Sequence, residues 1–237
     1  ETDPVIPGGQ GDQIQLVHLA SHSSGVSRLP PNMNLRYLLK NATDPYAAYD
    51  SALLQEGAAA EKVRDTPGTS WEYSNFGAAL LGAALARRAG TTWAEAVQAH
   101  VLQPHGLAAI GELEPPPGFG PTGDSTPPWT FDAMASAGSL DGSLSAMVDF
   151  ARLWLSPDPV MQGMLAVRIE RERNSTGLGW IAGEDHWWHN GGTGGYSTYV
   201  AVAPEKDVAV VVLLNQSRQA VTTLGMALMQ EALKGAE

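Results

Sequence analysis

The stretch that decides the fold is His189-Asn190-Gly191-Gly192-Thr193-Gly194-Gly195-Tyr196, which directly precedes two apolar segments. Residues 197–203 and 208–215 are rich in alternating and β-branched residues, and a short charged turn at residues 204–207 separates them. This pattern predicts a β-hairpin. The glycine run is therefore expected at or beside a strand. Glycines there let a ligand or another backbone approach closely, and they leave peptide N–H groups to bind an oxyanion or a carboxylate.

The side chain of His189 places an imidazole beside this glycine run. The ordinary pKa of a histidine side chain is about 6.5, so modest surroundings decide whether the ring acts as a cation, a base or a neutral donor. The alternative interpretation is that the glycines only allow two strands to bend and that the histidine is exposed. The sequence around His189 leaves both interpretations open.

The composition bounds the class of protein. With 237 residues, of which 43% are hydrophobic, the chain is long enough to bury a core as one large domain or as two lobes. Its formal net charge of -11 disfavours nucleic acid and anionic lipid as partners, because binding to either needs clusters of Lys and Arg. The absence of cysteine excludes disulfides, thiolate-bound zinc and a cysteine nucleophile. The apolar stretch at residues 208–214 is shorter than the roughly 18 to 20 residues that cross a bilayer, so no membrane span is expected.

The first residues of the sequence, ETDP, have neither the basic nor the apolar region of a signal peptide. No signal peptide is therefore expected in the sequence as given, although a mature exported protein has the same appearance. A periplasmic or secreted location is expected in preference to a cytoplasmic one.

A mainly helical lobe is predicted ahead of the glycine run. Residues 35–61 are rich in alanine and have a helical pattern that one proline interrupts. Residues 76–89 place apolar side chains on one helical face, and a glycine follows as a stop signal. The Tyr-Ser-Asn sequence at residues 73–75 is therefore expected at the N-terminus of this helix, where Ser74 or Asn75 is the N-cap on the simplest interpretation.

The rest of the chain is expected to supply further helices, strands and one long loop. The pattern predicts helices over residues 14–22, 92–103, 144–155 and 221–233, and short strands over residues 177–182 and 185–189. Residues 111–132 are rich in proline and glycine and predict an irregular loop, which is either a substrate rim or disordered.

A metal site is an alternative function from another class. The candidate ligands are His18, His22, Glu184, Asp185, His186 and His189. Residues three apart on a strand point to opposite faces, so His186 and His189 are expected to diverge. We therefore expect neither a metal nor a cofactor. By the same alternation, Trp187 and Trp188 are expected on opposite faces, one in the core and one lining a pocket beside His189.

Several segments follow one another in the order of known motifs. They are Leu19–Gly25 (LASHSSG), Pro67-Gly68, Tyr73-Ser74-Asn75, Leu81-Gly82, Pro104–Leu107 (PHGL), Ala137–Leu140 (AGSL) and His189-Asn190-Gly191-Gly192. Through them the sequence resembles the serine β-lactamase and penicillin-binding-protein superfamily, in particular its class C β-lactamase, D-aminopeptidase and family VIII esterase branch. The last motif has His-x-Gly in place of Lys-Thr-Gly.

The resemblance implies acyl transfer, in which a serine attacks a β-lactam, a D-amino-acid peptide or an ester and the acyl-enzyme is then hydrolysed. Tyr73 would be the general base or a hydrogen-bond relay, with its pKa lowered by a neighbouring cation. Asn75 would hold the substrate amide or orient the active-site network. His189 would replace the usual lysine, and Gly191 and Gly192 would bind the substrate, with the peptide N–H of Gly192 forming half of an oxyanion hole.

The sequence departs from the family at the nucleophile. None of its lysines has a serine three residues before it, so there is no Ser-x-x-Lys, and there is no Gly-x-Ser-x-Gly either. Three explanations remain, in this order of preference: a truncated or proteolysed piece of an ordinary enzyme, a pseudoenzyme that binds a family-type ligand, or a substitute nucleophile within the chain. Ser74 is the first candidate substitute, followed by Ser23, Ser24 and Ser197.

The predicted fold is a β-lactamase/transpeptidase-like α/β (α+β) sandwich, an antiparallel sheet flanked by helices, without its N-terminal segment. Residues 1–29 and 132–237 are predicted to form the incomplete sandwich lobe, and residues 30–131 the mainly helical lobe. Because a packing helix is expected to be absent, one sheet face is expected to be exposed. Exposed apolar surface favours association, so the chain is not expected to be a well-behaved monomer, and the missing segment or a second copy is the expected partner.

Overall fold

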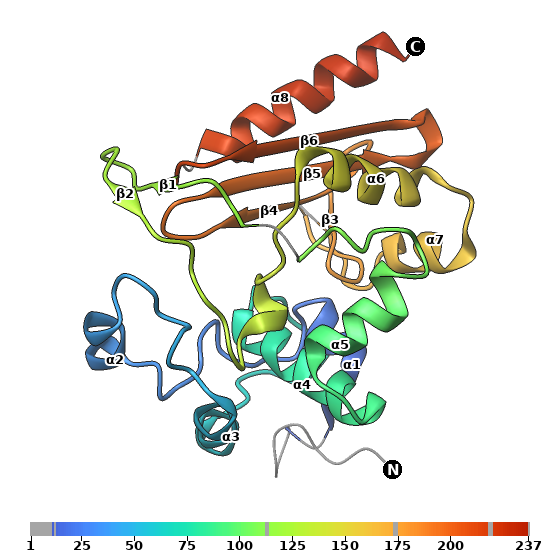
Figure 1. Ribbon diagram of the computed structural model, residues 1–237. Coiled ribbons are helices and arrows are strands. Elements are labelled where there is room, and N and C mark those ends of the chain that lie inside the picture. The colour runs from blue at the N-terminus through green and yellow to red at the C-terminus, as the bar shows by residue number, and fades with distance from the viewer. Residues whose placement is uncertain (1–10, 12, 112–113, 173–174, 218–219, 237) are drawn as a thin grey trace. The chain divides into compact units, whose positions relative to one another are not determined.

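The computed structural model describes residues 11, 13–111, 114–172, 175–217 and 220–236 (Figure 1). The chain divides into two compact units. We call Glu1–Ala99 with Trp129–Ser139 the helical unit, and His100–Pro128 with Leu140–Glu237 the sheet unit. The lobe boundaries predicted from the sequence stay a prediction.

The helical unit is built from short helices around α4. Its elements are α1 (Leu16–Ala20), α2 (Leu35–Lys40), α3 (Ser51–Ala60), α4 (Asn75–Ala89), α5 (Trp93–Val97) and the 3₁₀ turn η3 (Ala135–Ala137), while the π-helical turn η2 (Gln98–Leu102) follows α5. The helix predicted over residues 76–89 is thus confirmed as α4. The N-cap of α4 is Ser74, and its C-cap is Gly90, whose φ of 70° suits a left-handed glycine cap.

The core of the helical unit collects apolar side chains from segments far apart in the sequence. Its buried members include Leu19, Tyr49, Phe76, Leu80 and Met134. The break predicted by the proline within residues 35–61 separates α2 from α3, and side-chain caps begin both helices. The helical prediction for this region is therefore confirmed, with residues 41–50 left between the two helices.

The sheet unit holds a four-stranded antiparallel sheet in the order β3-β4-β5-β6. Its strands are β3 (Ile181–Ala182), β4 (Trp187–Gly192), β5 (Ser197–Ala203) and β6 (Val208–Leu214), and the 3₁₀ turn η4 (Pro204–Lys206) joins the last two. The predicted hairpin is therefore confirmed as β5 and β6. The strand predicted over residues 177–182 is mostly wrong, because only Ile181 and Ala182 pair as a strand. A Cβ on Gly177 would lie 2.5 Å from the Met164 carbonyl, so the chain turns there against another backbone.

Helices cover both faces of this sheet. Helix α8 (Ala220–Gly235) packs with Trp188 and Tyr199 on one face, and α6 (Leu144–Leu155) lies with Trp187 and Val202 on the other. Figure 1 shows α8 running along the sheet. A Cβ on Gly225 would lie 2.2 Å from the Tyr199 ring, so glycine at this position lets the helix approach the sheet. The sheet unit also contains α7 (Pro159–Leu165) and a small hairpin of β1 (Gly118–Phe119) and β2 (Ser125–Thr126).

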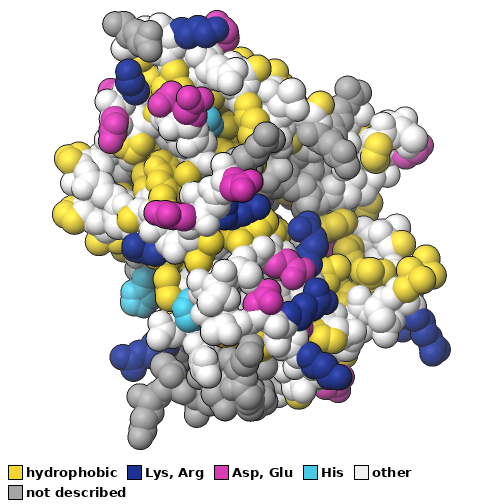
Figure 2. Space-filling model, turned by 180° about the vertical axis from the view of Figure 1, so that it is seen from behind, with side chains coloured by type: hydrophobic (Ala, Val, Ile, Leu, Met, Phe, Trp, Pro, Cys, Tyr) yellow, Lys and Arg dark blue, Asp and Glu magenta, His cyan; other side chains and the backbone are white. Residues whose placement is uncertain are grey.

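The expectation of an exposed apolar sheet face is wrong, since α6 and α8 occupy the two faces. Apolar surface is instead exposed at Leu224 and Leu228 on α8, and six of the seven residues of β6 are only half-buried. In the described residues, no further strand pairs with the outer edge of β6. Hydrophobic side chains also reach the molecular surface seen in Figure 2. Association of the chain stays a prediction, which sedimentation of the 25.0 kDa chain tests.

None of the described helices is both long enough and apolar enough to cross a membrane.

Candidate active site

Ser74 is held as the N-cap of α4. Its Oγ accepts a hydrogen bond from the Gly77 N–H at 2.7 Å and donates one to the Ser27 carbonyl at 2.7 Å, and its side chain is buried. Both bonds belong to a residue that ends a loop and begins a helix. This geometry favours the N-cap interpretation over the candidate substitute nucleophile, which needs an exposed hydroxyl beside a base.

The other candidate serines are buried as well. Ser23 contacts the Oγ of Ser21 at 2.9 Å, and Ser197 donates to the Gln216 carbonyl at 2.8 Å. Ser24 is 2% exposed. None of these side chains lies at an exposed position where a substrate carbonyl reaches it easily.

Tyr73 lies among aromatic and cationic side chains of the helical unit. The ring of His22 is 4.3 Å from the Tyr73 ring, and the Arg28 guanidinium carbon lies 5.1 Å from its centroid. Burial raises the pKa of Tyr73, and the positive charge of Arg28 opposes that rise. The lowered pKa implied by the family resemblance is therefore wrong for this structure, because burial outweighs the neighbouring cation.

Asn75 belongs to a second polar contact at the start of α4. Its Nδ2 donates a hydrogen bond to the hydroxyl of Tyr46 at 3.0 Å. Tyr46 packs against Trp129 and Phe131, with ring centroids 5.6 Å and 5.4 Å away, and burial raises its pKa. The Asn75 amide is thus oriented by a tyrosine that lies 29 residues earlier in the chain.

Arg28 and Tyr46 were not predicted as site residues, and His22 was predicted only as a candidate metal ligand. Nothing near Arg28 or Tyr46 carries a motif. The position of His22 inside the LASHSSG motif was the signal available for it.

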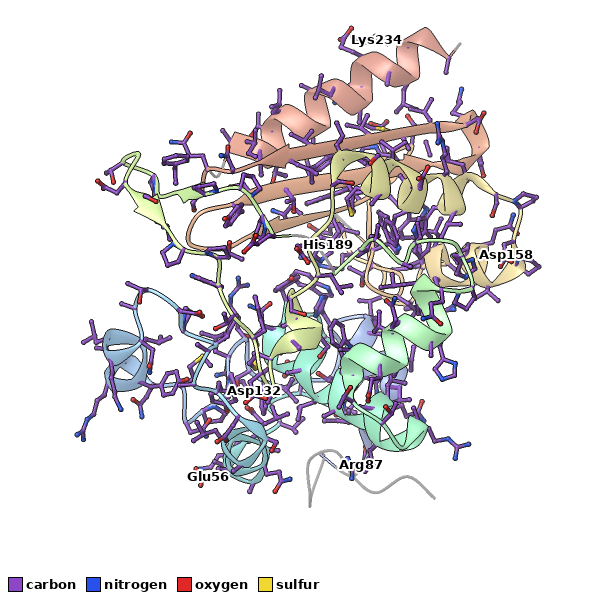
Figure 3. The ribbon with its side chains drawn as sticks, viewed as in Figure 1. Glu56, Arg87, Asp132, Asp158, His189 and Lys234 are labelled. Atoms are coloured by element: carbon purple, nitrogen blue, oxygen red, sulfur yellow. The ribbon has the colours of Figure 1, made fainter. Side chains whose placement is uncertain are left out.

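His189 lies on β4 of the sheet unit, as labelled in Figure 3. It pairs with Val200 of β5, so it shares the sheet face of Trp187, two residues away. Burial lowers the pKa of His189, while a backbone hydrogen bond involving Asn190 acts in the opposite direction. The imidazole is therefore favoured in its neutral form, able to donate from one ring nitrogen and accept at the other.

The two glycines that follow His189 differ in what surrounds them. A Cβ on Gly191 would lie 2.6 Å from Thr198 Oγ1, whereas nothing lies within 4 Å of a Cβ on Gly192. The Gly191 position is therefore restricted by packing within the sheet. The Gly192 position is open and exposed.

The hydrogen-bond pattern gives a direction to the peptide N–H of Gly192. The Thr193 N–H donates to the Tyr196 carbonyl at 3.0 Å, which makes these two residues a hydrogen-bonded pair. Pairs alternate along an antiparallel ladder, so Gly192 and Ser197 form a pair without hydrogen bonds and the Gly192 N–H points away from β5. Among the described residues, β3 pairs only with Trp187 and Trp188, so no strand takes up that N–H.

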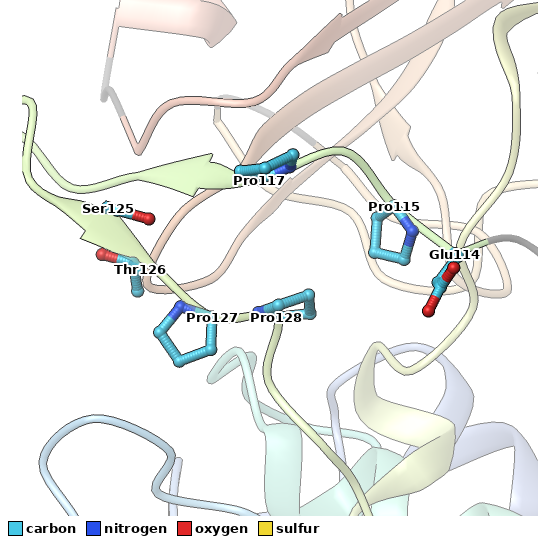
Figure 4. A pocket seen from close by; sticks show the side chains of 7 residues that line it. All are labelled: Glu114, Pro115, Pro117, Ser125, Thr126, Pro127 and Pro128. Atoms are coloured by element: carbon cyan, nitrogen blue, oxygen red, sulfur yellow. The ribbon is translucent and has the colours of Figure 1, made fainter.

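Hydrogen bonds join the proline-rich segment, which was predicted as a substrate rim, to the glycine turn. The Phe119 N–H donates to the Gly195 carbonyl at 3.2 Å, and the Tyr196 hydroxyl donates to the Pro116 carbonyl at 2.7 Å. A Cβ on Gly195 would lie 3.0 Å from the Gly118 Cα, so this glycine permits a close approach of two backbones. The segment borders a cavity of about 360 Å³, whose lining is shown in Figure 4: Glu114, Pro115, Pro117, Ser125, Thr126, Pro127 and Pro128.

The remaining aromatic and histidine predictions have these outcomes. Trp188 and Trp187 are on opposite faces, as predicted, and both belong to apolar clusters. Trp187 also lines a cavity of about 610 Å³ together with His186, at the opposite end of β4 from Gly192. In the part of the chain that the structure describes, no three side chains of His, Asp or Glu come together as metal ligands.

The predicted site residues thus form two sets. Tyr73, Ser74 and Asn75 start a helix of the helical unit, and His189, Gly191 and Gly192 end a strand of the sheet unit.

Comparison with known proteins relates the chain to one family. The family model described as Beta-lactamase matches residues 3–232. A beta-lactamase/D-alanine carboxypeptidase from Pseudomonas syringae is similar with a TM-score of 0.81 and 16% identity, over 100% of this chain and 76% of that one. The beta-lactamase/D-alanine carboxypeptidase from Yersinia pestis, complexed with citrate, is similar with a TM-score of 0.76 and 23% identity, over 94% of this chain and 70% of that one. A class C beta-lactamase is similar with a TM-score of 0.80 and 16% identity, over 99% of this chain and 72% of that one.

Proposed function

This chain belongs to the beta-lactamase family, and from that premise we propose that it acts in serine-type acyl transfer on a β-lactam, a D-amino-acid peptide or a small ester. The superfamily and the fold predicted from the sequence are confirmed. The neighbours are described as beta-lactamase, or as beta-lactamase/D-alanine carboxypeptidase. One nucleophile and one oxyanion hole serve all three substrate classes, so the proposal covers all three.

The observation that carries the proposal is the geometry of Gly192. Its peptide N–H points away from β5 at an exposed position that has no side chain. Such an N–H is the kind of donor that stabilises the oxyanion of a tetrahedral intermediate. We assign Gly192 as an oxyanion donor, with Gly191 shaping the strand beside it and His189 as a neutral donor or acceptor in the place of the family's lysine.

In the helical unit, roles are proposed for Tyr73 and Asn75. The phenol of Tyr73 would act as base or relay, and the Asn75 amide would hold the substrate amide. The pKa of Tyr73 is raised, so it favours the protonated phenol and supports the relay more than the free phenolate. A cation supplied with the nucleophile would add to Arg28 in lowering that pKa.

The proline-rich segment 114–128 is proposed to select the substrate. It is anchored to Gly195 and Tyr196, just after the proposed oxyanion donor. Four of the seven residues that line its cavity are prolines, whose restricted backbones favour a rigid rim. Changes here are expected to alter which acyl group is accepted, since a pocket rim discriminates through the contacts it makes in the transition state.

A catalytically inactive binding protein is the second candidate function. It is favoured by the sequence, which has no Ser-x-x-Lys, and by the burial of Ser23, Ser24, Ser74 and Ser197. Such a protein would bind a β-lactam or peptide reversibly through the same peptide N–H groups. The two candidates differ in whether a covalent adduct forms.

Intact mass spectrometry decides between them. The chain is incubated with a penicillin probe and, separately, with a fluorophosphonate. One stoichiometric adduct, located by peptide mapping, supports a nucleophile within these 237 residues. An adduct that forms only in a chain extended upstream to include Ser-x-x-Lys supports the hydrolase with its nucleophile in that extension. Reversible binding without an adduct in either form supports the binding protein and overturns the hydrolase.

A further inference from the structure

His22 has an unusual backbone for its residue type. Its φ is 57°, and it shares a positive φ with Asp207 as the two non-glycine residues of this kind in the described part of the chain. It lies just after α1, whose C-cap is Ser21. The left-handed position after a helix is most often glycine or asparagine, because a larger side chain is strained there. A positive φ at a residue other than glycine motivates a hypothesis about what its side chain does.

The main chain of His22 holds the residue before Tyr73. The Glu72 N–H donates to the His22 carbonyl at 2.9 Å. This bond joins the turn after α1 to the segment that leads into α4. It fixes the backbone on one side of Tyr73.

The side chain of His22 holds the residue after Tyr73. The Ser74 N–H donates to Nδ1 of His22 at 3.2 Å. This bond requires Nδ1 to carry no proton, so it selects the imidazole tautomer with hydrogen on Nε2. One residue, which lies 52 positions before Ser74 in the sequence, therefore anchors the chain on both sides of Tyr73.

The ring of His22 also contacts the phenol directly. The two ring centroids are 4.3 Å apart with an angle of 36° between the ring planes, and Trp71 meets the His22 ring edge-on at 6.2 Å. The Arg28 guanidinium provides a further contact to the Tyr73 ring. Capping of α4 needs only Ser74, so the contact between the rings of His22 and Tyr73 has no part in starting the helix.

We propose that His22 is a positioning residue, which fixes the direction of the Tyr73 phenol through its Nδ1 contact to Ser74 and its ring contact to Tyr73. The consequence for chemistry rests on the proposed function. A proton relay works only when its donor and acceptor stay within hydrogen-bond reach, and displacing such a group by about 1 Å costs on the order of 10²-fold in rate.

The test compares three substitutions. His22→Ala removes both contacts. His22→Asn keeps an acceptor close to the place of Nδ1 and tolerates a positive φ, but removes the ring. His105→Asn is the matched control, because His105 is an exposed histidine of the sheet unit. The readouts are the ¹³Cζ resonance of Tyr73 in tyrosine-labelled protein, assigned with Tyr73→Phe, its titration with pH, and the rate of acylation by the penicillin probe.

We expect the resonance and titration of Tyr73 to change in folded His22→Ala, to return partly toward the wild type in His22→Asn, and to stay unchanged in His105→Asn. At saturating probe, we expect acylation to fall about 10²-fold in His22→Ala and to recover to within about 10-fold in His22→Asn. Partial rescue separates positioning from simple loss of structure.

Unchanged Tyr73 resonance and titration in folded His22→Ala overturn the proposal, as do identical values in the alanine and asparagine variants. If His22→Ala does not fold, His22→Asn decides alone, because loss of the ring contact must then shift the Tyr73 resonance. A wild-type chain that takes no probe, even when extended upstream, counts against the proposed function, while the resonance of Tyr73 still decides the role of His22.

Discussion

The two sets of site residues are constructed in different ways. The Tyr73 set depends on side chains that come together from distant segments: His22, Arg28 and, beside Asn75, Tyr46. The Gly192 position depends on backbone alone, through the register of β4 with β5 and the absence of a side chain. A site made of side chains is sensitive to each neighbour, whereas a site made of backbone tolerates substitution wherever the ladder remains intact.

Replacement of Tyr73 is expected to have the largest effect, and the effect is on the rate of acylation. In a chain that reacts with the penicillin probe, Tyr73→Phe is expected to slow acylation by about 10²- to 10⁴-fold, because the phenolic proton is lost while the buried ring remains. Single-turnover kinetics with the probe measures it.

The control is Tyr196→Phe in the sheet unit. This hydroxyl donates to the Pro116 carbonyl of the rim, so its loss is expected to weaken apparent binding of the probe and to leave the acylation rate at saturation within about threefold. Equal effects of the two substitutions on that rate would contradict the assignment of Tyr73 as the relay.

Removal of the Ser74 hydroxyl tests whether this serine is structural. Ser74→Ala leaves the Gly77 N–H and the Ser27 carbonyl without their partner, so the free energy of unfolding is expected to fall by about 2 kcal/mol. Denaturant titration measures it.

Ser143→Ala provides a matched N-cap substitution in the sheet unit. Ser143 caps α6 through the Ala146 N–H, but its other contact is the exposed Ser145 hydroxyl, so a smaller loss of about 1 kcal/mol is expected. If Ser74→Ala preserves stability yet abolishes an adduct mapped to this helix, the N-cap interpretation fails and the substitute nucleophile returns.

The sequence predicted the position of Gly192, which depends on backbone, better than the surroundings of Tyr73, which depend on side chains. Glycines next to alternating apolar residues predict a strand and an approachable peptide, and β4, β5 and β6 confirm the hairpin beside them. The positions of His22 and Arg28 against Tyr73 depend on tertiary packing at long sequence separation, which no local pattern records. The sequence implied a lowered pKa for Tyr73, whereas burial raises it. A motif of three residues does not record how deeply its side chains are buried.

Alanine at each of the two adjacent glycines sharpens the comparison within β4. Gly191→Ala is expected to cost about 1 kcal/mol of unfolding free energy, because the new Cβ displaces Thr198 Oγ1. Gly192→Ala has open space around the Cβ and is expected to change stability by less than about 0.5 kcal/mol.

Thermal or denaturant unfolding of the two variants measures this difference. The double variant Gly191→Ala with Thr198→Ala is expected to recover part of the loss, since it removes the hydroxyl that the Cβ meets. A larger loss for Gly192→Ala than for Gly191→Ala would show that the environment of Gly192 is not open.

The smallest expected effect is the contribution of His189 to the pH dependence of stability. Burial lowers the pKa of its imidazole, so the folded state binds its proton at a lower pH than the unfolded chain, whose histidine titrates at about 6.5. Between the two pKa values the unfolded state binds more protons, and the free energy of unfolding therefore decreases as the pH falls below about 6.5.

Replacing His189 with glutamine, which keeps polar groups but does not titrate, is expected to make this decrease shallower between about pH 7 and pH 5. Denaturant titration at several pH values measures the slope. The same titrations on His100→Gln, at an exposed position of the sheet unit, are the control for the exchange of histidine for glutamine itself. A His189→Gln chain with the same slope as the wild type would mean that His189 is accessible to water and protonates equally in both states, and the neutral imidazole proposed beside Gly191 would then have no support.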